Sequence, residues 1–363
     1  MGTEVMKLSP SGSSLAGSAA RHLIGSTALM VIFTSAGCSA ERKSTRMQLS
    51  WPTANHAYAE GRPLADYIQP TASGRVESGL FGCVRNGGTR FHEAIDLRSL
   101  ERDAKGESTD QVFAAFDGIV RHVNRVAGNS SYGRYVVIEH VQAVPAVYTL
   151  YAHLRSVPQH ISPGETVTRA QVIGTMGRSS GGYRIPRERA HLHFEIGLQL
   201  TTNFQSWYNW KKFGSRNTHG PWNGMNLTGF NPLAFYDAFR DRVVHTFGEF
   251  IAISTPAVVV RVAVAEVPDF VRRYPSLVSS PFEERSIAGW EVTFDQHGLP
   301  FKWTALDAAE VAGMMSREVS IHWFNQPVVA ACKCKELIVQ KSGAPRAGAD
   351  LQTQLQLLFS LRQ

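Results

Sequence analysis

Short apolar runs separated by glycine- and proline-bearing turns dominate the chain between residues 76 and 200. The runs at 112–116, 135–138 and 147–151 are examples, and Pro163-Gly164 marks one of the turns. Many short strands at this spacing are typical of an antiparallel β domain. We therefore expect residues 76–200 to fold as one antiparallel β-sheet domain.

The pattern changes on the carboxyl side of this domain. Residues 201–248 are rich in aromatic side chains, and we expect this extension to pack on the β domain, with Asn231 and Pro232 as the cap and first turn of a helix. Residues 249–363 combine strand and helix patterns: a strand at 258–264, a hairpin turn at 296–298, a helix near 305–317 and a terminal helix from Asp350. We predict a smaller α/β C-terminal domain of unknown function in a chain that is mainly β.

The amino-terminal residues have the layout of a bacterial export signal. A basic pair, Arg21 and His22, precedes a short apolar run that ends in small residues and Cys38. Residues 35–38 resemble the lipobox of bacterial lipoproteins, with Ser35 where leucine is usual. We expect residues 1–37 to be a signal peptide and Cys38 to be lipidated, with ordinary cleavage nearby or an uncleaved anchor as the alternatives. Residues 38–75 are polar, which favours a tether and a segment leading into the β domain rather than a core.

Length and composition narrow the class of protein. A chain of 363 residues has room for roughly two domains beside a targeting segment. With 43% hydrophobic and 18% charged residues, and no apolar run of about 18 residues, it is neither a disordered nor a multi-span membrane protein. The net charge of +7 favours anionic partners, but the basic residues form no dense cluster and the export signal argues against nucleic acid.

The cysteines leave their pairing open. If Cys38 carries a lipid, Cys83, Cys332 and Cys334 remain, and an odd number cannot pair completely within one chain. One long-range disulfide is compatible with this count but cannot be assigned. The C-x-C spacing of Cys332 and Cys334 lacks a second nearby pair or histidines for a metal, which favours structural or free thiols.

Candidate chemistry lies in three short motifs of the β domain: F-H-E-A-I-D-L at 91–97, Y-A-H-L at 151–154 and H-L-H-F-E-I at 191–196. Side chains alternate along a strand, so His191, His193 and Glu195 share one face. A neutral imidazole and a carboxylate are good zinc ligands. His92, Asp96 and one histidine of the H-x-H pair would leave the fourth tetrahedral position for water, the arrangement of a catalytic zinc.

The remaining histidines have a natural role beside such a metal. His153 and the other member of the H-x-H pair can hydrogen-bond the attacking water and the tetrahedral intermediate. Glu195 is either a residue that orients a metal ligand or a solvated strand residue. The loop 178–189 holds four arginines, which either form a groove wall for carboxylates of the substrate or belong to a solvated loop.

Taken together and in this order, the three motifs resemble the LytM/lysostaphin-type zinc endopeptidases, peptidase family M23. The resemblance covers residues 76–200 and includes the stretches around 112–120, 132–140 and 161–174. It implies one Zn²⁺ per chain held by His92, Asp96 and His193, and it makes His153 and His191 the catalytic pair. The chain departs from the family pattern at Ala94, where glycine is usual, and no metal or catalytic position is altered.

The resemblance implies a zinc metalloendopeptidase that hydrolyses peptide crosslinks of bacterial peptidoglycan through a zinc-activated water. Stem peptides of the cell wall would be its partners, and a lipid on Cys38 would hold it to a membrane of the cell envelope, with the periplasm as the expected location. The alternative is a non-enzymatic cell-envelope binding or amidase-regulating protein with an M23-like domain. Loss of a ligand would favour that alternative, and every ligand position is intact.

Overall fold

The computed structural model of the chain describes residues 46–282, 285–341 and 343–362. The expected signal peptide, residues 1–37, and the expected lipidation site, Cys38, lie outside the described residues. Within the described residues, no helix is both long enough and apolar enough to cross a membrane.

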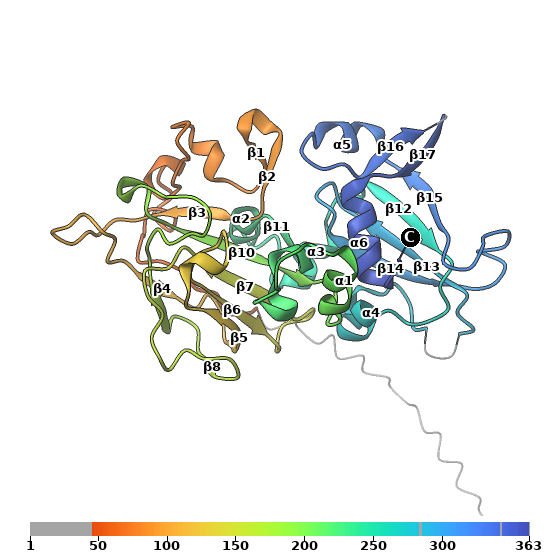
Figure 1. The fold of residues 1–363 in the computed structure, drawn as a ribbon, viewed down its shortest axis with the longest axis horizontal. Coiled ribbons are helices and arrows are strands. Elements are labelled where there is room, and N and C mark those ends of the chain that lie inside the picture. Colours follow the sequence, from red (N-terminus) through yellow and green to blue (C-terminus); the bar gives the residue numbers. More distant parts are fainter. Residues whose placement is uncertain (1–45, 283–284, 342, 363) are drawn as a thin grey trace, which may run out of the picture. The chain divides into compact units, whose positions relative to one another are not determined.

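A seven-stranded sheet forms the centre of the β domain (Figure 1). Its strands are β3 (Ile95–Arg98), β5 (Gly118–Asn124), β6 (Tyr135–His140), β7 (Val147–Ala152), β8 (Thr166–Val167), β10 (His191–Gln199) and β11 (Leu227–Phe230). Their order is β11-β10-β7-β6-β5-β8, and β3 also pairs with β10. Two smaller pairs are β1 (Gly82–Arg85) with β2 (Arg90–His92) and β4 (Gln111–Phe113) with β9 (Val172–Thr175). Because every pairing between these strands is antiparallel, the predicted class of the β domain is confirmed.

Strand β10 is the central element for the site because three strands pair with it. β7 lies along one side, while β3 and β11 share the other side, next to residues 191–194 and 196–199 respectively. All nine residues of β10 are buried. Leu192, Phe194 and Ile196 belong to the large hydrophobic cluster, so the alternating residues His191, His193 and Glu195 lie on the opposite face.

The segment before the β domain contributes to the core, in contrast to the expectation for residues 38–75. Tyr67 and Ile68 are buried in the large hydrophobic cluster. The backbone N–H of Gln69 donates to the carbonyl of Asp96, and the N–H of Arg98 donates to the carbonyl of Tyr67. The segment is polar overall, so its composition did not indicate these few buried residues. They bind β3 along the edge that does not pair with β10.

The aromatic extension packs on the β domain and also completes its sheet. It contains β11 and the helices α1 (Phe204–Lys211) and α2 (Pro232–Arg240), and α3 (Phe247–Ala252) begins at its end. As predicted, Asn231 caps α2 by accepting a hydrogen bond from the N–H of Ala234, and Pro232 is its first residue. Phe235 of α2 stacks on Phe247 of α3, with ring centroids 4.7 Å apart.

The C-terminal region is built on a four-stranded antiparallel sheet of order β14-β13-β12-β15. Its strands are β12 (Val258–Val262), β13 (Gly289–Phe294), β14 (Pro300–Leu306) and β15 (Val319–Phe324), followed by the pair β16 (Ile338–Lys341) and β17 (Ala344–Ala347). Its helices are α4 (Asp269–Arg273), α5 (Gln326–Ala331) and α6 (Ala349–Phe359). Short 3-10 helices elsewhere cover Leu64–Asp66, Val76–Gly79, Asn86–Gly88, Ala127–Asn129, Arg187–Arg189, Gly220–Trp222, Gly224–Asn226 and Pro275–Leu277. The predicted strand at 258–264, hairpin turn at 296–298 and terminal helix are all present.

The helix predicted near residues 305–317 is wrong. Ala305 and Leu306 pair with Trp290 and Gly289 of β13, so β14 extends into the predicted helix. Gly313 then adopts a φ of 85°, a left-handed conformation that an α-helix does not accommodate. Strand pairing therefore takes the first two residues of the predicted helix, and turns occupy most of the rest.

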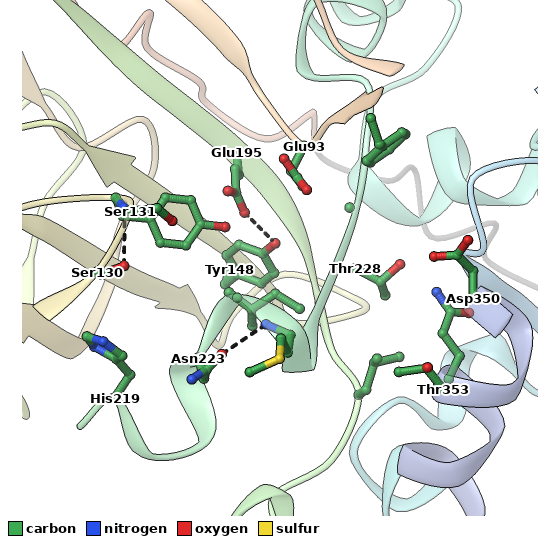
Figure 2. A pocket seen from close by; sticks show the side chains of 18 of the residues that line it. Glu93, Ser130, Ser131, Tyr148, Glu195, His219, Asn223, Thr228, Asp350 and Thr353 are labelled. Atoms are coloured by element: carbon green, nitrogen blue, oxygen red, sulfur yellow. Dashed lines mark hydrogen bonds between the residues drawn. The ribbon is translucent and has the colours of Figure 1, made fainter. Parts of the chain in front are cut away.

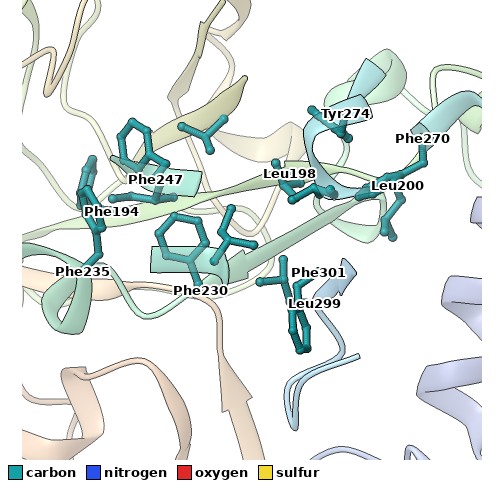
Figure 3. Packing of buried hydrophobic residues seen from close by; sticks show 14 of the residues in the cluster. Phe194, Leu198, Leu200, Phe230, Phe235, Phe247, Phe270, Tyr274, Leu299 and Phe301 are labelled. Carbon is teal, nitrogen blue, oxygen red and sulfur yellow. The ribbon is translucent and has the colours of Figure 1, made fainter. Parts of the chain in front are cut away.

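One hydrophobic cluster runs from the β domain into the C-terminal region. Figure 3 shows Phe194 and Leu198 of β10 in the same cluster as Phe270 of α4 and Phe301 of β14. A disulfide between Cys83 of β1 and Cys334 joins the two regions a second time, and Cys332 is free and buried. The β domain and the C-terminal region are thus tied by apolar packing and by a covalent bond.

Candidate metal centre and catalytic pair

Three potential metal ligands converge where β10 begins. His193 of β10 lies opposite Asp96 in the pairing with β3, and His92 is the last residue of β2. His92 Nε2 lies 3.1 Å from Asp96 Oδ1 and 3.2 Å from His193 Nδ1. His193 Nδ1 lies 3.4 Å from Asp96 Oδ1. All three side chains are buried.

The spacing of these atoms suits a tetrahedral zinc ion. Zinc bonds of about 2.0–2.1 Å separate the ligand atoms of a tetrahedral site by about 3.3 Å. The three distances between Asp96 Oδ1, His92 Nε2 and His193 Nδ1 span 3.1–3.4 Å. Two imidazoles and one carboxylate are also the donor types that zinc prefers. These residues could therefore hold the metal without a large rearrangement.

The two oxygens of Asp96 have different surroundings. Oδ2 accepts a hydrogen bond from the guanidinium of Arg85, while Oδ1 is buried without a hydrogen-bond partner. A buried polar atom with no partner costs free energy, and a cation facing Oδ1 would remove that cost. Burial raises the pKa of Asp96, but nearby His92, His191 and His193 outweigh it and hold the pKa well below its usual value. The carboxylate is thus ionised, and its Oδ1 faces the imidazoles of His92, His191 and His193.

The outer contacts of the two histidines leave the correct nitrogens free for a metal. His92 Nδ1 lies 2.7 Å from the carbonyl of Leu80 and must donate to it, so Nε2 is the unprotonated nitrogen. His193 Nε2 lies 2.8 Å from Glu195 Oε1, which fixes Nδ1 as its free nitrogen. Glu195 is buried and also accepts from the hydroxyl of Tyr148. The structure excludes the interpretation of Glu195 as a solvated strand residue and supports its interpretation as a residue that orients a metal ligand.

His193 is electrostatically coupled to both carboxylates. Burial lowers the pKa of His193, but its contacts with Asp96 and Glu195 raise it to about 9. The site without a cation therefore takes up a proton in the place where a metal would supply positive charge. A metal and this proton compete for the same imidazole.

The other two predicted site residues, His153 and His191, lie next to this centre. His191 is the first residue of β10, and its Nε2 lies 3.5 Å from Asp96 Oδ1. His153 follows β7 in a left-handed conformation with a φ of 61°, and its ring centroid lies 4.8 Å from that of His191. The structure therefore brings all five predicted residues into one buried cluster.

Backbone carbonyls hold both of these imidazoles in one tautomer. His153 Nδ1 lies 2.8 Å from the carbonyl of Ser179, and His191 Nδ1 lies 2.7 Å from that of Arg189. Burial lowers the pKa of each histidine, and for His153 the neighbouring His191 and His193 lower it further. At neutral pH both rings are neutral, with Nε2 able to accept a proton.

Arg85 is part of the site although the sequence motifs did not indicate it. Its Nη2 lies 2.7 Å from His92 Nε2 and also donates to Asp96 Oδ2. The register of the β1–β2 hairpin, in which Gly82 pairs with His92 and Arg85 with Arg90, brings it there. A prediction of a β-hairpin over residues 82–92 would have indicated that Arg85 lies close to His92. Because a metal needs the same nitrogen of His92, metal binding and this contact exclude each other.

Two of the four loop arginines are engaged inside the protein. Arg178 and Arg187 form ion pairs with Glu107 at 2.7 and 2.9 Å. Hydrogen bonds from Arg178, which outweigh partial burial, and from Arg187 lower the pKa of Glu107 to about 2. Both side chains therefore already pair with a carboxylate of the β domain, Arg178 through Nε and Nη2 and Arg187 through Nε.

Comparison with known proteins agrees with the motifs. Residues 90–203 match the model of peptidase family M23, which confirms the resemblance for this part of the chain. The matched range contains His92, Asp96, His153, His191 and His193. This part of the chain is thus similar to a peptidase family. No curated protein matches the chain.

Several solved structures are similar to parts of the chain. The catalytic domain of lysostaphin from Staphylococcus simulans is 18% identical, with 48% of this chain and 95% of that chain covered and a TM-score of 0.29. The catalytic domain of the prophage-encoded M23 protein EnpA from Enterococcus faecalis is 19% identical over 36% of this chain and 79% of that chain, with a TM-score of 0.26. A zinc-containing peptidase from Vibrio cholerae is 23% identical over 41% of this chain and 33% of that chain, with a TM-score of 0.22.

Proposed function

We propose that the protein is a zinc metalloendopeptidase that hydrolyses peptide crosslinks of bacterial peptidoglycan. The observation that carries this proposal is the arrangement of His92, Asp96 and His193, whose ligand atoms lie within 4.8 Å of one another. Asp96 Oδ1 has no hydrogen-bond partner among the described residues. Three protein ligands leave a fourth position open, as catalytic zinc sites require.

The chemistry divides between the metal and the two further histidines. Zinc, when bound, polarises the scissile carbonyl and lowers the pKa of water. His153 and His191 each donate Nδ1–H to a backbone carbonyl, so each has Nε2 available to take a proton from the attacking water. Once protonated, the same nitrogen can donate to the carbonyl oxygen or deliver the proton to the leaving amine. The depressed pKa values of both imidazoles favour delivery of the proton to the leaving amine, because each imidazolium holds its proton weakly.

Peptidoglycan as the substrate is a proposal drawn from the family. Lysostaphin is described as an antimicrobial peptidase, and a neighbour from Ruminococcus gnavus is described as a putative glycyl-glycine endopeptidase. We also propose that the chain is exported to the cell envelope and carries a lipid on Cys38, as its sequence predicts. Together these would place the enzyme beside the stem peptides of the cell wall.

Single substitutions separate the metal ligands from the catalytic pair. We expect His153→Ala and His191→Ala to retain one zinc per chain and to lose hydrolysis of crosslinked muropeptides by about 10²–10⁴-fold, the range of general acid–base catalysis. His92→Ala, Asp96→Ala and His193→Ala should lose both zinc and activity. Zinc content by elemental mass spectrometry and product formation by chromatography measure the two effects.

A matched control is available in the same domain. His160 is exposed and lies outside the cluster, so His160→Ala should keep both zinc and activity. Retained activity in His153→Ala or His191→Ala would refute the proposed proton transfer for that residue. Retained zinc in all three ligand variants would refute the metal centre.

A further inference from the structure

A cavity of about 680 Å³ opens next to the candidate metal centre, between the β domain and the C-terminal region. Figure 2 shows Tyr148, Glu195 and Glu93 on its β-domain side, with Asp350 and Thr353 of α6 on the opposite side. Volumes of about 300–1,000 Å³ are typical of ligand sites. The cavity therefore has room for a few residues of a peptide.

The cavity reaches Glu195, the hydrogen-bond partner of His193. Tyr132 also lines it, and its ring centroid lies 5.3 Å from that of His193. A peptide bound here would lie beside two neighbours of His193, Glu195 and Tyr132.

The C-terminal wall of the cavity is held firmly against the β1–β2 hairpin. The Cys83–Cys334 disulfide joins this hairpin to the segment before α6. Beside it, the ammonium of Lys335 lies 4.3 Å from the centroid of the Phe91 ring, and the His297 ring lies 5.0 Å from the Phe81 ring. The C-terminal region is thus positioned to contact whatever binds in the cavity.

Most charged groups of the cavity already have partners. Asp350 accepts from the N–H of Glu336 at 2.7 Å and pairs with Lys335 at 3.8 Å. Lys211 lies 5.5 Å from the ring of Trp210. Glu195 is engaged by His193 and Tyr148 as described above. None of these groups calls for a ligand of opposite charge.

Two acceptors on opposite walls are left without partners. Glu93 is exposed, and among the described residues it makes no hydrogen bond and no ion pair. The Oε1 atom of Gln354 in α6 is buried and also has no hydrogen-bond partner. Both oxygens can only accept hydrogen bonds, and Glu93 lies near Glu195, the partner of His193, on the β-domain side of the cavity (Figure 2). The group that complements them is a hydrogen-bond donor with a positive charge.

We propose that this cavity binds a segment of the peptide substrate that carries a free ammonium group, such as the side chain of a diamino acid in a stem peptide. Glu93 is the charge partner of that ammonium, and Gln354 accepts a hydrogen bond from the same segment. The C-terminal region is then a specificity wall of the active site. This inference rests on the proposed function for the identity of the substrate.

Binding to an uncrosslinked stem peptide tests the inference without hydrolysis. The probes are a lysine-containing stem peptide and the same peptide acetylated on its lysine Nζ, titrated into the purified protein by calorimetry. We expect the free amine to bind at least tenfold more tightly than the acetylated form. Glu93→Gln should abolish this difference, and Gln354→Leu should weaken binding of the free amine.

Glu101→Gln is the matched control, because Glu101 is exposed on the same domain and does not line the cavity. It should keep the full preference for the amine. Equal binding of the two peptides by the unmodified protein, or an unchanged preference in Glu93→Gln, would overturn the inference. If the protein prefers the amine but cleaves no crosslink, the proposed function is refuted and the cavity assignment stands. If it cleaves crosslinks but shows no preference for the amine, the cavity assignment is refuted and the proposed function stands.

Discussion

Glu195 connects the candidate metal centre with the buried interior of the sheet. Its Oε1 lies 2.8 Å from His193 Nε2, and its Oε2 accepts from the Tyr148 hydroxyl at 3.0 Å. A carboxylate in this position fixes the ring orientation of a ligating histidine and increases its basicity. We therefore predict that Glu195 is a positioning residue for His193.

Glu195→Gln should weaken zinc binding by about 10–100-fold, the usual effect of removing such a partner. The amide keeps the size of the side chain but loses the negative charge that supports His193. Competition with a chelator of known affinity measures the change. Glu165→Gln, at an exposed position, is the control, and an unchanged zinc affinity in Glu195→Gln would contradict the role.

At this scale the sequence indicated the five residues that the structure brings together. Four lie on β2, β3 and β10, where strand alternation and the H-x-x-x-D spacing are local properties, and His153 directly follows β7. The sequence left Glu195 undecided, since its burial depends on Tyr148 from the neighbouring strand β7. It missed Arg85, whose position depends on the register of a hairpin.

At the scale of secondary-structure elements, His140 links β6 to the start of β5 and to β7. It is the last residue of β6 and is buried. Its Nδ1 donates to the carbonyl of Asp117, just before β5, and its Nε2 lies 2.8 Å from Thr149 Oγ1 of β7. Burial lowers the pKa of His140 to about 4, although the carbonyl of Asp117 acts in the opposite direction.

This buried imidazole should make the fold sensitive to acid. The unfolded chain binds the proton at a pKa of 6.5, whereas the folded chain binds it only at about 4. Stability is therefore lost as the pH falls from about 6.5 to about 4, by roughly 3 kcal/mol for this group. Urea unfolding at pH 7.0 and pH 4.5 measures the loss.

His140→Gln should reduce that pH dependence by most of this amount, although its stability at pH 7.0 is lower because packing changes. His160→Gln, at an exposed position, should leave the dependence as it is. The same pH dependence in His140→Gln and the unmodified protein would refute the assignment to His140.

Whether an element could be predicted from the sequence depends on whether nearby or distant residues determine it. The strands of the β domain and the cap of α2 were predictable, since alternation, turn residues and the Asn231-Pro232 pair act within a few residues. The helix near 305–317 was not, because the pairing of β14 with β13 decided its first residues. The pairing of β11 with β10 likewise depends on tertiary packing.

At the scale of the whole molecule, the disulfide closes a span of 251 residues between Cys83 and Cys334. The sequence could not assign this pair, because three cysteines were available as partners. In the structure the unpaired Cys332 is also close, with its sulfur atom 3.3 Å from that of Cys83. The bond fixes the hairpin that carries Arg85 and His92 to the C-terminal region. It therefore supports both the fold and the surroundings of the metal centre.

Cys83→Ser should lower the free energy of unfolding by about 2–5 kcal/mol, the usual cost of losing a native disulfide. Cys332→Ala keeps the bond and is the matched control for the loss of a sulfur atom. Denaturant unfolding and non-reducing peptide mapping measure stability and pairing. A full disulfide in the control together with unchanged stability in Cys83→Ser would show that the bond does not stabilise the fold.

Digestion of purified peptidoglycan, followed by mass spectrometry of the fragments, tests the proposed hydrolase most directly. The purified protein is compared with His193→Ala, and the zinc content of both is measured. The account predicts one zinc per chain and new fragments cut at a crosslink peptide bond for the unmodified protein, and neither for His193→Ala. One bound zinc without new fragments would contradict a hydrolase acting on the cell wall, and the absence of zinc from the unmodified protein would contradict the metal centre itself.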